Sequence, residues 1–314
     1  MSDKKVLKIK ENVEKVIVGK SDVIDYVMVA LLSEGHILLE DVPGTGKTML
    51  AKTFAKSVGV KFARIQFTAD MLPSDITGLK FYDRKMGEFV FRQGPIFAGI
   101  VLADEINRAT PKTQSALLES MEERQVTVDG ETRKLEEPFI VIATDNPIET
   151  VGTFPLPEAQ LDRFLMKVSM GYPTNEEELE IVDRFFEKSP FDSVNSVCEG
   201  TDIIAMRQDA RNVYVHPVLR QYVVNLVEAT RNHNFVEVGA SPRATLALMR
   251  AIRAYAYIKG RDYCVPEDVR CMAVPVLAHR LKMRARNITG GATGAEVIKE
   301  LLETIPVPTE EWER

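Results

Sequence analysis

Cysteine, histidine and tryptophan are scarce in this 314-residue chain, which contains three, four and one of them. Cys198, Cys264 and Cys271 are odd in number and include no Cys-x-x-Cys pair, so free thiols in a reducing compartment are the simplest account. The histidines show no His-Glu-x-x-His spacing, which excludes that class of zinc site. We therefore expect no dedicated metal centre built from these side chains.

Long hydrophobic runs are also missing. Residues 1–20 mix Lys and Glu without an apolar core, unlike a secretory signal peptide. The longest uncharged apolar run nearby, residues 27–32, is far shorter than the about 20 residues that span a bilayer. We expect a cytoplasmic protein without membrane insertion.

The overall composition is that of a globular protein with a sizeable core, since 45% of the residues are hydrophobic and 27% are charged. The length favours about two domains. The net charge of −6, from 40 Lys and Arg against 46 Asp and Glu, argues weakly against a broad nucleic-acid surface. A local basic pore could still be hidden in that average.

The strongest motif is Glu-Asp-Val-Pro-Gly-Thr-Gly-Lys-Thr at residues 40–48. It follows an apolar run at residues 37–39 and precedes a pattern with apolar residues on one helical face. This strand–turn–helix context is what a phosphate-binding loop requires. The first glycine of the full pattern is absent, because Asp41 stands in its place.

The chemistry of this loop follows from the helix that it precedes. The first amide groups of a helix have no internal partner and carry the positive end of the dipole, so they bind phosphate oxygens. Gly44 and Gly46 let the backbone approach the phosphates, and either can adopt a positive φ at little steric cost. Lys47 can reach the β- and γ-phosphates, and Thr48 can place its hydroxyl on Mg²⁺. The predicted nucleotide-binding residues are Pro43, Gly44, Thr45, Gly46, Lys47, Thr48 and Met49.

Two carboxylates follow directly after the uncharged run at residues 100–103. Such a run fits a buried parallel strand that ends at a ligand crevice. Asp104 can hold Mg²⁺ through water, and Glu105 can orient or deprotonate the attacking water. An acidic pair after a strand is often only a turn, and the upstream loop is what favours chemistry here.

Two other segments have both a structural and a functional interpretation. Asn146 ends another predicted buried strand, where its amide could bind the γ-phosphate or the attacking water; an Asn-Pro turn is the alternative. Val18 and Gly19 join helices predicted at residues 5–17 and 22–33 and could lay their backbone against adenine. An ordinary helix junction is equally compatible with that sequence.

Predicted hairpins interrupt the α/β pattern twice. Two short strands flank a polar turn at residues 79–92, and we expect most of their aromatic side chains to pack on the body of the domain. A second hairpin at residues 125–136 turns at Asp129 and Gly130, which is a strong two-residue turn signal. Inserted segments of this kind are often functional.

Helical patterns replace strand patterns after Tyr172. Helices are expected at residues 174–188, 202–211, 216–233, 241–259, 266–285 and 293–304. Arg243 lies in the first turn of one of them, where the helix dipole disfavours a cation, so an anion elsewhere would explain its position. A solvated surface arginine is the alternative. The basic run at residues 279–286 is expected to be a charged helix face rather than a nucleic-acid site.

Together these motifs resemble the AAA+ ATPases and, among them, the MoxR family, over nearly the whole chain. Besides the loop at 40–48, the resemblance rests on the segments 72–78, 104–109, 117–126, 156–164 and 239–244. Asp145 stands where the family often has Gln, and Thr110 where Pro is frequent. Neither departure touches the proposed chemistry, although Asp145 adds a negative charge near it.

The resemblance implies an α/β fold: a P-loop core at residues 1–172 with a five-stranded parallel sheet in the order 5-1-4-3-2, and an all-helical C-terminal lid domain at 173–314. It implies ATP and Mg²⁺ as ligands and a homo-oligomeric ring, commonly a hexamer. By the same likeness Asn146 is sensor 1 and Arg243 is sensor 2. Arg163 is then an arginine finger that acts on the nucleotide of a neighbouring subunit.

The predicted function is Mg²⁺-dependent ATP hydrolysis by a ring that remodels or chaperones protein clients, and the resemblance adds a partner with a von Willebrand factor A domain. Two alternatives stay open. A nucleic-acid-dependent motor would place Arg124, Arg133 and Lys134 of the second hairpin in a pore, but the net negative charge counts against it. A nucleotide-switched scaffold would bind ATP with little turnover, and the intact acidic pair and Asn146 speak against that.

Overall fold

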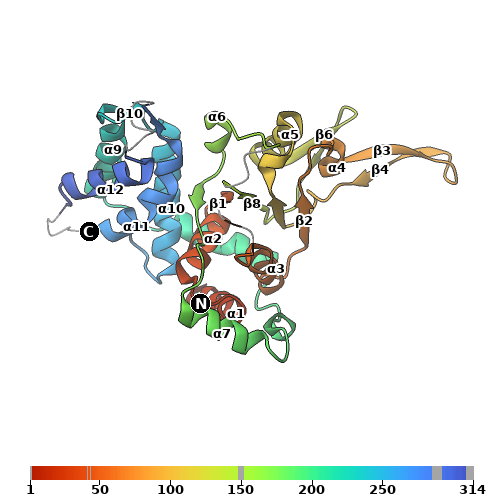
Figure 1. Cartoon of the computed structure of the whole chain (residues 1–314), viewed down its shortest axis with the longest axis horizontal. Coiled ribbons are helices and arrows are strands. Elements are labelled where there is room, and N and C mark those ends of the chain that lie inside the picture. The colour runs from red at the N-terminus through yellow and green to blue at the C-terminus, as the bar shows by residue number, and fades with distance from the viewer. Residues whose placement is uncertain (1, 41, 43, 148–151, 285–291, 309–314) are drawn as a thin grey trace. The chain divides into compact units, whose positions relative to one another are not determined.

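The computed structural model describes residues 2–40, 42, 44–147, 152–284 and 292–308 (Figure 1). Contacts divide the chain into two compact units. Unit 1 contains Met1–Ile24, His36–Leu156 and Val168–Ile204, and unit 2 contains Asp25–Gly35, Pro157–Lys167 and Ala205–Arg314. The predicted boundary at residue 172 follows chain order whereas these units follow packing, so that boundary stays a prediction.

A five-stranded sheet is built mainly from unit 1. Its order is β2-β5-β8-β1-β9, which is the predicted 5-1-4-3-2 when these strands are numbered along the chain. The pairs β2–β5, β5–β8 and β8–β1 are parallel. The strands are β1 (Ile37–Glu40), β2 (Phe62–Gln66), β5 (Ile100–Asp104), β8 (Ile140–Asp145) and β9 (Met166–Val168).

The central strands of this sheet are almost completely buried. The apolar residues at 37–39, 100–103 and 140–143 are at most 1% exposed. Continuous apolar runs are typical of parallel strands that are covered on both faces. Polar residues therefore occur where the strands end, and the carboxyl ends of parallel strands meet at one edge of the sheet.

Helices and short turns complete unit 1. They are α1 (Ser2–Glu14), α3 (Lys47–Ser57), α4 (Pro73–Thr77), η1 (Ile106–Arg108), α5 (Pro111–Glu123), α7 (Asn175–Phe185) and η2 (Pro190–Ser193). Two more helices, α2 (Ser21–Leu32) and α8 (Gly200–Arg211), have residues in both units. Helix α3 contacts β2 and β5 and buries Leu50, Ala51 and Phe54, as its sequence pattern predicts.

Both predicted hairpins are present in unit 1. They pair β3 (Gly78–Asp83) with β4 (Glu88–Gln93) and β6 (Gln125–Val128) with β7 (Glu131–Lys134), both antiparallel. The second hairpin turns at Asp129 and Gly130, whose φ angles are 51° and 78°. Positive φ at both positions is the geometry of the turn type that the sequence indicates.

The expected packing of the aromatic side chains on the first hairpin is wrong for three of them. Phe81, Tyr82 and Phe89 are 40%, 54% and 70% exposed. Strands β3 and β4 form a two-stranded sheet whose tip projects away from the rest of unit 1, which leaves these side chains in contact with solvent (Figure 1). Tyr82 and Phe89 instead contact each other, with ring centroids 5.4 Å apart.

Unit 2 is predominantly helical. Its helices are α6 (Glu158–Leu161), α9 (Pro217–Asn232), α10 (Pro242–Ile258), α11 (Pro266–Leu277), η3 (Ala278–Arg280) and α12 (Gly294–Thr304). Helix α10 packs against α9 and α11, and α12 against α9 and α11. Among the residues that the structure describes, no helix has both the length and the apolar character needed to cross a bilayer.

The C-terminal region is predominantly helical, as predicted, but it also contains one small sheet. Two short strands, β10 (Val236–Val238) and β11 (Lys282–Met283), form an antiparallel pair in unit 2. The helix predicted at residues 266–285 therefore ends at Leu277. Backbone pairing with a segment more than 40 residues away, such as the bond from Arg284 N to Phe235 O, outweighs the local helical pattern.

Candidate functional site

A cavity of about 430 Å³ lies at the carboxyl ends of the central strands in unit 1. Its walls come from the loop after β1, the first turns of α3 and the ends of β2, β5 and β8. Nine predicted site residues line it: Gly44, Thr45, Gly46, Lys47, Thr48, Met49, Asp104, Glu105 and Asn146. Sequence reasoning missed four more lining residues, which are Lys52, Arg64, Gln66 and Thr144.

The remaining predicted site residues have other locations. Val18 and Gly19 join α1 to α2 and do not line this cavity. Pro43 lies outside the described residues. Arg163 and Arg243 belong to unit 2.

The phosphate-binding loop has the backbone geometry that its glycines suggest. Gly44 and Gly46 have φ angles of 88° and 89°. A Cβ atom built at either position would meet nothing within 4 Å, so conformation rather than space requires glycine there. Helix α3 begins at Lys47, whose Nζ donates a 3.1 Å hydrogen bond to the Val42 carbonyl oxygen. The loop thus presents a helix start and one cation to the cavity.

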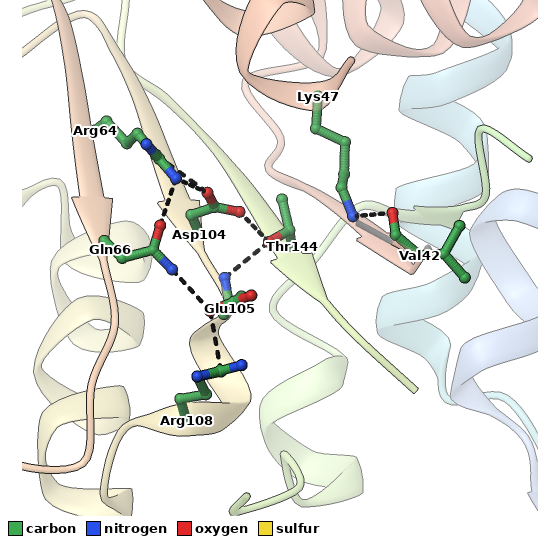
Figure 2. Close-up of polar contacts among 8 residues, drawn as sticks. All are labelled: Val42, Lys47, Arg64, Gln66, Asp104, Glu105, Arg108 and Thr144. Atoms are coloured by element: carbon green, nitrogen blue, oxygen red, sulfur yellow. Dashed lines mark hydrogen bonds and ion pairs between the residues drawn. The ribbon is translucent and has the colours of Figure 1, made fainter. Parts of the chain in front are cut away.

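Asp104 is held on both carboxylate oxygens (Figure 2). Arg64 donates to Oδ2 from Nη2 at 2.6 Å and from Nε at 3.1 Å. Thr144 donates from Oγ1 to Oδ1 at 2.7 Å, and the Glu105 amide donates to the same hydroxyl at 2.8 Å. The end of β5 is therefore tied to β2 on one side and to β8 on the other.

Glu105 has a different set of partners. Its Oε2 accepts a 2.8 Å bond from Gln66 Nε2 and lies 3.0 Å from Arg108 Nε (Figure 2). Its φ is 58°, a left-handed conformation that is costly for a residue with a side chain. Because Glu105 leaves the strand in this way, the two adjacent carboxylates turn to different partners.

A signal for the missed residues Arg64 and Gln66 was present in the sequence. They lie two positions apart on β2, and residues at that spacing share one face of a strand. In the predicted strand order this strand lies beside the one that ends at Asp104, and Gln66 is opposite Asp104 in the register. Polar residues at the end of the neighbouring strand were the clue.

Asn146 lies between the phosphate-binding loop and the acidic pair. It follows β8, which is between β1 and β5 in the sheet. The residue is 5% exposed and lines the cavity. Its backbone oxygen accepts a 3.3 Å bond from Asn107 Nδ2, which fixes the chain after the strand.

The donor set in this cavity fits Mg²⁺ that is bound together with a nucleotide. Thr48 and Asp104 line the same space and offer oxygen atoms, the ligands that Mg²⁺ prefers. Within the described part of the chain, no group of three or more His, Cys, Asp or Glu side chains could hold a metal ion. The ion would therefore take its other ligands from phosphate oxygens and water.

The two predicted arginines of unit 2 have different surroundings. Arg163 follows α6, and no residue that the structure describes forms a hydrogen bond or ion pair with its guanidinium. Arg243 is the second residue of α10, and its side chain is 51% exposed. Its Nε lies 3.7 Å from Asp162 Oδ2, so an anion does lie near this misplaced cation.

Comparison with known proteins agrees with this geometry. Residues 36–166 match the ATPase family associated with various cellular activities (AAA), and residues 228–301 match the AAA lid domain. The chain is 44% identical over 305 residues to chaperone MoxR1 of Mycobacterium tuberculosis (strain ATCC 25618 / H37Rv), which covers 94% of this chain and 80% of the relative. The chain belongs to the MoxR family of AAA+ ATPases.

Other relatives match nearly the whole of this MoxR-family chain. YeaC of Bacillus subtilis (strain 168) is 47% identical over 300 residues, which covers 96% of this chain and 94% of YeaC. The crystal structure of a candidate ATPase from Cytophaga hutchinsonii superposes with a TM-score of 0.92 at 38% identity, covering 98% of this chain and 96% of that one. The protein is therefore an ATP-binding ATPase whose relatives include a chaperone.

Proposed function

We propose that this ATPase works as a homo-oligomeric ring, commonly a hexamer in its family, whose Mg²⁺-dependent hydrolysis of ATP remodels protein clients. One observation carries the proposal: a single cavity is lined by the phosphate-binding loop, the acidic pair and Asn146. Phosphoryl transfer requires phosphate binding, charge neutralisation and a positioned water molecule. These residues supply all three.

Each residue of the cavity has a role in this proposal. Lys47 and the amide groups at the start of α3 bind the β- and γ-phosphates. Thr48 and Asp104 would hold Mg²⁺, which would neutralise charge on the phosphate oxygens. Glu105 accepts a proton from the attacking water, and the Asn146 amide orients that water. Val18 and Gly19 would contact adenine.

Assembly is part of the proposal because the site lacks one component. Arginine fingers increase the rate of phosphoryl transfer by roughly 10³–10⁵ in other enzymes, by stabilising charge in the transition state. The guanidinium of Arg163 has no partner among the described residues, so it is available to the nucleotide of a neighbouring subunit. Arg243 would respond to the nucleotide of its own subunit.

Protein clients are favoured over nucleic acid. Arg133 of the second hairpin, which a nucleic-acid motor would use, pairs with Glu131 at 2.6 Å and lies 4.2 Å from the centre of the Phe91 ring. The net charge is −6. A partner with a von Willebrand factor A domain belongs to the proposal by family resemblance, and three free cysteines are consistent with the cytoplasm.

The variant Glu105→Gln tests the proposed chemistry. We expect it to bind ATP with affinity within about twofold of the wild type, since amide and carboxylate have the same shape. Turnover should fall by about 10² or more, the usual contribution of a general base. Isothermal titration and a phosphate-release assay measure the two quantities, with the exposed Glu123→Gln as the control. Near-normal turnover of Glu105→Gln would rule out this role.

The same variant tests the client. When Glu105→Gln is incubated with ATP in native lysate, specific proteins should co-purify with it. They should be released when ADP replaces ATP. Salt-sensitive binding of DNA, together with ATP hydrolysis stimulated by DNA, would instead support the nucleic-acid motor.

A further inference from the structure

Arg280 is a buried cation in unit 2, in a turn that follows a helix, whereas its basic run was predicted to be a charged helix face. It ends the turn η3 after α11, and its side chain is 4% exposed. Charged side chains are seldom buried unless they are paired and hydrogen-bonded, because desolvation is costly. A buried guanidinium at this position therefore requires a specific set of acceptors.

The acceptors of Arg280 are concentrated on one short segment. Nε donates to Asp162 Oδ1 at 2.6 Å. Nη2 donates to the Phe164 oxygen at 2.7 Å and to the Asp162 oxygen at 3.3 Å, and Nη1 donates to the Leu165 oxygen at 3.1 Å. The Val276 oxygen in the preceding helix α11 is a further acceptor. The partners in the segment are 115 to 118 residues away in sequence.

These acceptors flank Arg163 on both sides. Asp162 comes directly before it, and Phe164 and Leu165 directly after it, whereas the Arg163 guanidinium takes no part in the network. A guanidinium is a rigid planar fork, so bonds to both flanks fix the direction in which the residue between them leaves the chain. His279 Nε2, 3.2 Å from the Phe164 oxygen, adds a second tie.

We propose that Arg280 is a positioning residue for Arg163. It holds residues 162–165 so that the Arg163 guanidinium reaches the nucleotide of the neighbouring subunit. The proposal rests on the proposed role of Arg163 in trans. The competing explanation is that Arg280 only stabilises the fold. Its loss would then lower the stability of the chain and impair the chain's own nucleotide site, without a selective effect on hydrolysis in the neighbouring subunit.

Arg280→Lys keeps the charge but cannot reproduce the planar fork. We expect it to bind ATP within about twofold of wild type and to lose about 100-fold in kcat, the cost of a small misplacement of a catalytic group. Lys282→Met is the matched control, since Lys282 belongs to the same basic run but is 41% exposed and pairs with Glu237. Its kcat should not change. Unchanged kcat in folded Arg280→Lys would overturn the proposal.

Mixed assemblies separate positioning from structure. Lys47→Ala subunits have a disabled nucleotide site but an intact finger, so they should restore hydrolysis to Arg280→Lys subunits as they do to Arg163→Ala subunits. If mixing restores hydrolysis to Arg163→Ala subunits but not to Arg280→Lys subunits, the positioning role of Arg280 is wrong and the role of Arg163 in trans is retained. If Arg163→Ala is not restored at any ratio, the finger in trans fails, and the positioning role fails with it.

A second variant covers the case in which Arg280→Lys does not fold. Asp162→Asn retains an oxygen that can accept from Arg280 Nε but loses the charge that pairs with it. We expect about a tenfold loss of kcat, smaller because the backbone acceptors remain, with the same restoration by Lys47→Ala. A folded Asp162→Asn protein with normal kcat would contradict the proposal.

Discussion

Single charged residues in the cavity are balanced by partners from neighbouring strands. Asp104 carries both the predicted metal contact and an ion pair with Arg64, whose guanidinium is 46% exposed. The Asp104 side chain is only 13% exposed, so this pair is partly buried. A divalent cation that binds Asp104 would replace Arg64 as the balancing charge. The 2.8 Å bond from Gln66 helps to orient the Glu105 carboxylate, and Arg108, 3.0 Å from the same oxygen, balances its charge.

Lys47→Ala tests the phosphate role at this scale. The substitution removes the one loop cation, so ATP affinity should fall by about 100-fold, which corresponds to about 2.7 kcal/mol. Isothermal titration with ATP measures the change. Lys56→Ala on the same helix is the control, because Lys56 donates to the Phe191 oxygen and does not line the cavity. ATP affinity that is equal in the two variants would contradict the phosphate role of Lys47.

Among the elements, the turn η3 combines a buried cation with a histidine that resists protonation. Removal from water, followed by the charge of Arg280, lowers the pKa of His279 well below its ordinary value of 6.5. The imidazole thus stays neutral beside Arg280 and can keep its contact with the Phe164 oxygen. Protonation of this ring is therefore disfavoured in the folded chain.

This titration predicts a pH dependence of stability. Well above pH 6.5 the ring is neutral in both the folded and the unfolded chain. As the pH falls below that value, the unfolded chain binds a proton that the folded chain does not, so the free energy of unfolding decreases. At about pH 5.5 the loss can reach about 1.4 kcal/mol. Denaturant unfolding at about pH 7.5 and about pH 5.5 measures it.

His279→Gln is the comparison for this prediction. Gln cannot titrate but retains a donor for the Phe164 oxygen. The other titratable side chains contribute equally in the two proteins. The variant should therefore lose less free energy of unfolding than wild type over the same pH interval. An equal loss in the two proteins would show that His279 does not titrate on unfolding.

For the whole molecule, the proposed function makes hydrolysis a property of the assembly. The cavity in unit 1 contains the loop, the acids and Asn146, while Arg163 in unit 2 is assigned to a neighbour's site. An isolated chain would then bind ATP but hydrolyse it slowly. Assembly would control turnover by supplying the guanidinium.

Dilution tests this dependence directly. We expect turnover per chain to fall by about 10³ when rings dissociate, as arginine-finger contributions indicate, while ATP affinity per chain changes little. Sedimentation velocity and phosphate release at matched protein concentrations provide the comparison. Arg163→Ala is the control, since its low turnover should not depend on concentration. Constant wild-type turnover across dissociation would argue that each chain is complete by itself.

The sequence by itself determined the phosphate-binding loop, the acidic pair, Asn146 and the order of the central strands. These features depend on contacts between near neighbours in the chain or on a motif shared with a family. Gly44 to Thr48 form a site within one turn, and a continuous apolar run before Asp104 is sufficient to indicate a buried strand. The cavity confirms that these residues lie together.

Only the tertiary structure decided the partners of the acids and the surroundings of Arg280. Arg64 reaches Asp104 across 40 positions, and Arg280 reaches Asp162 across 118. The pairing of β10 with β11 similarly ended a helix that the local pattern would have continued. A local pattern records which face of an element is apolar. It cannot record which distant carboxylate or carbonyl will meet a given cation, because packing of the whole chain selects that partner.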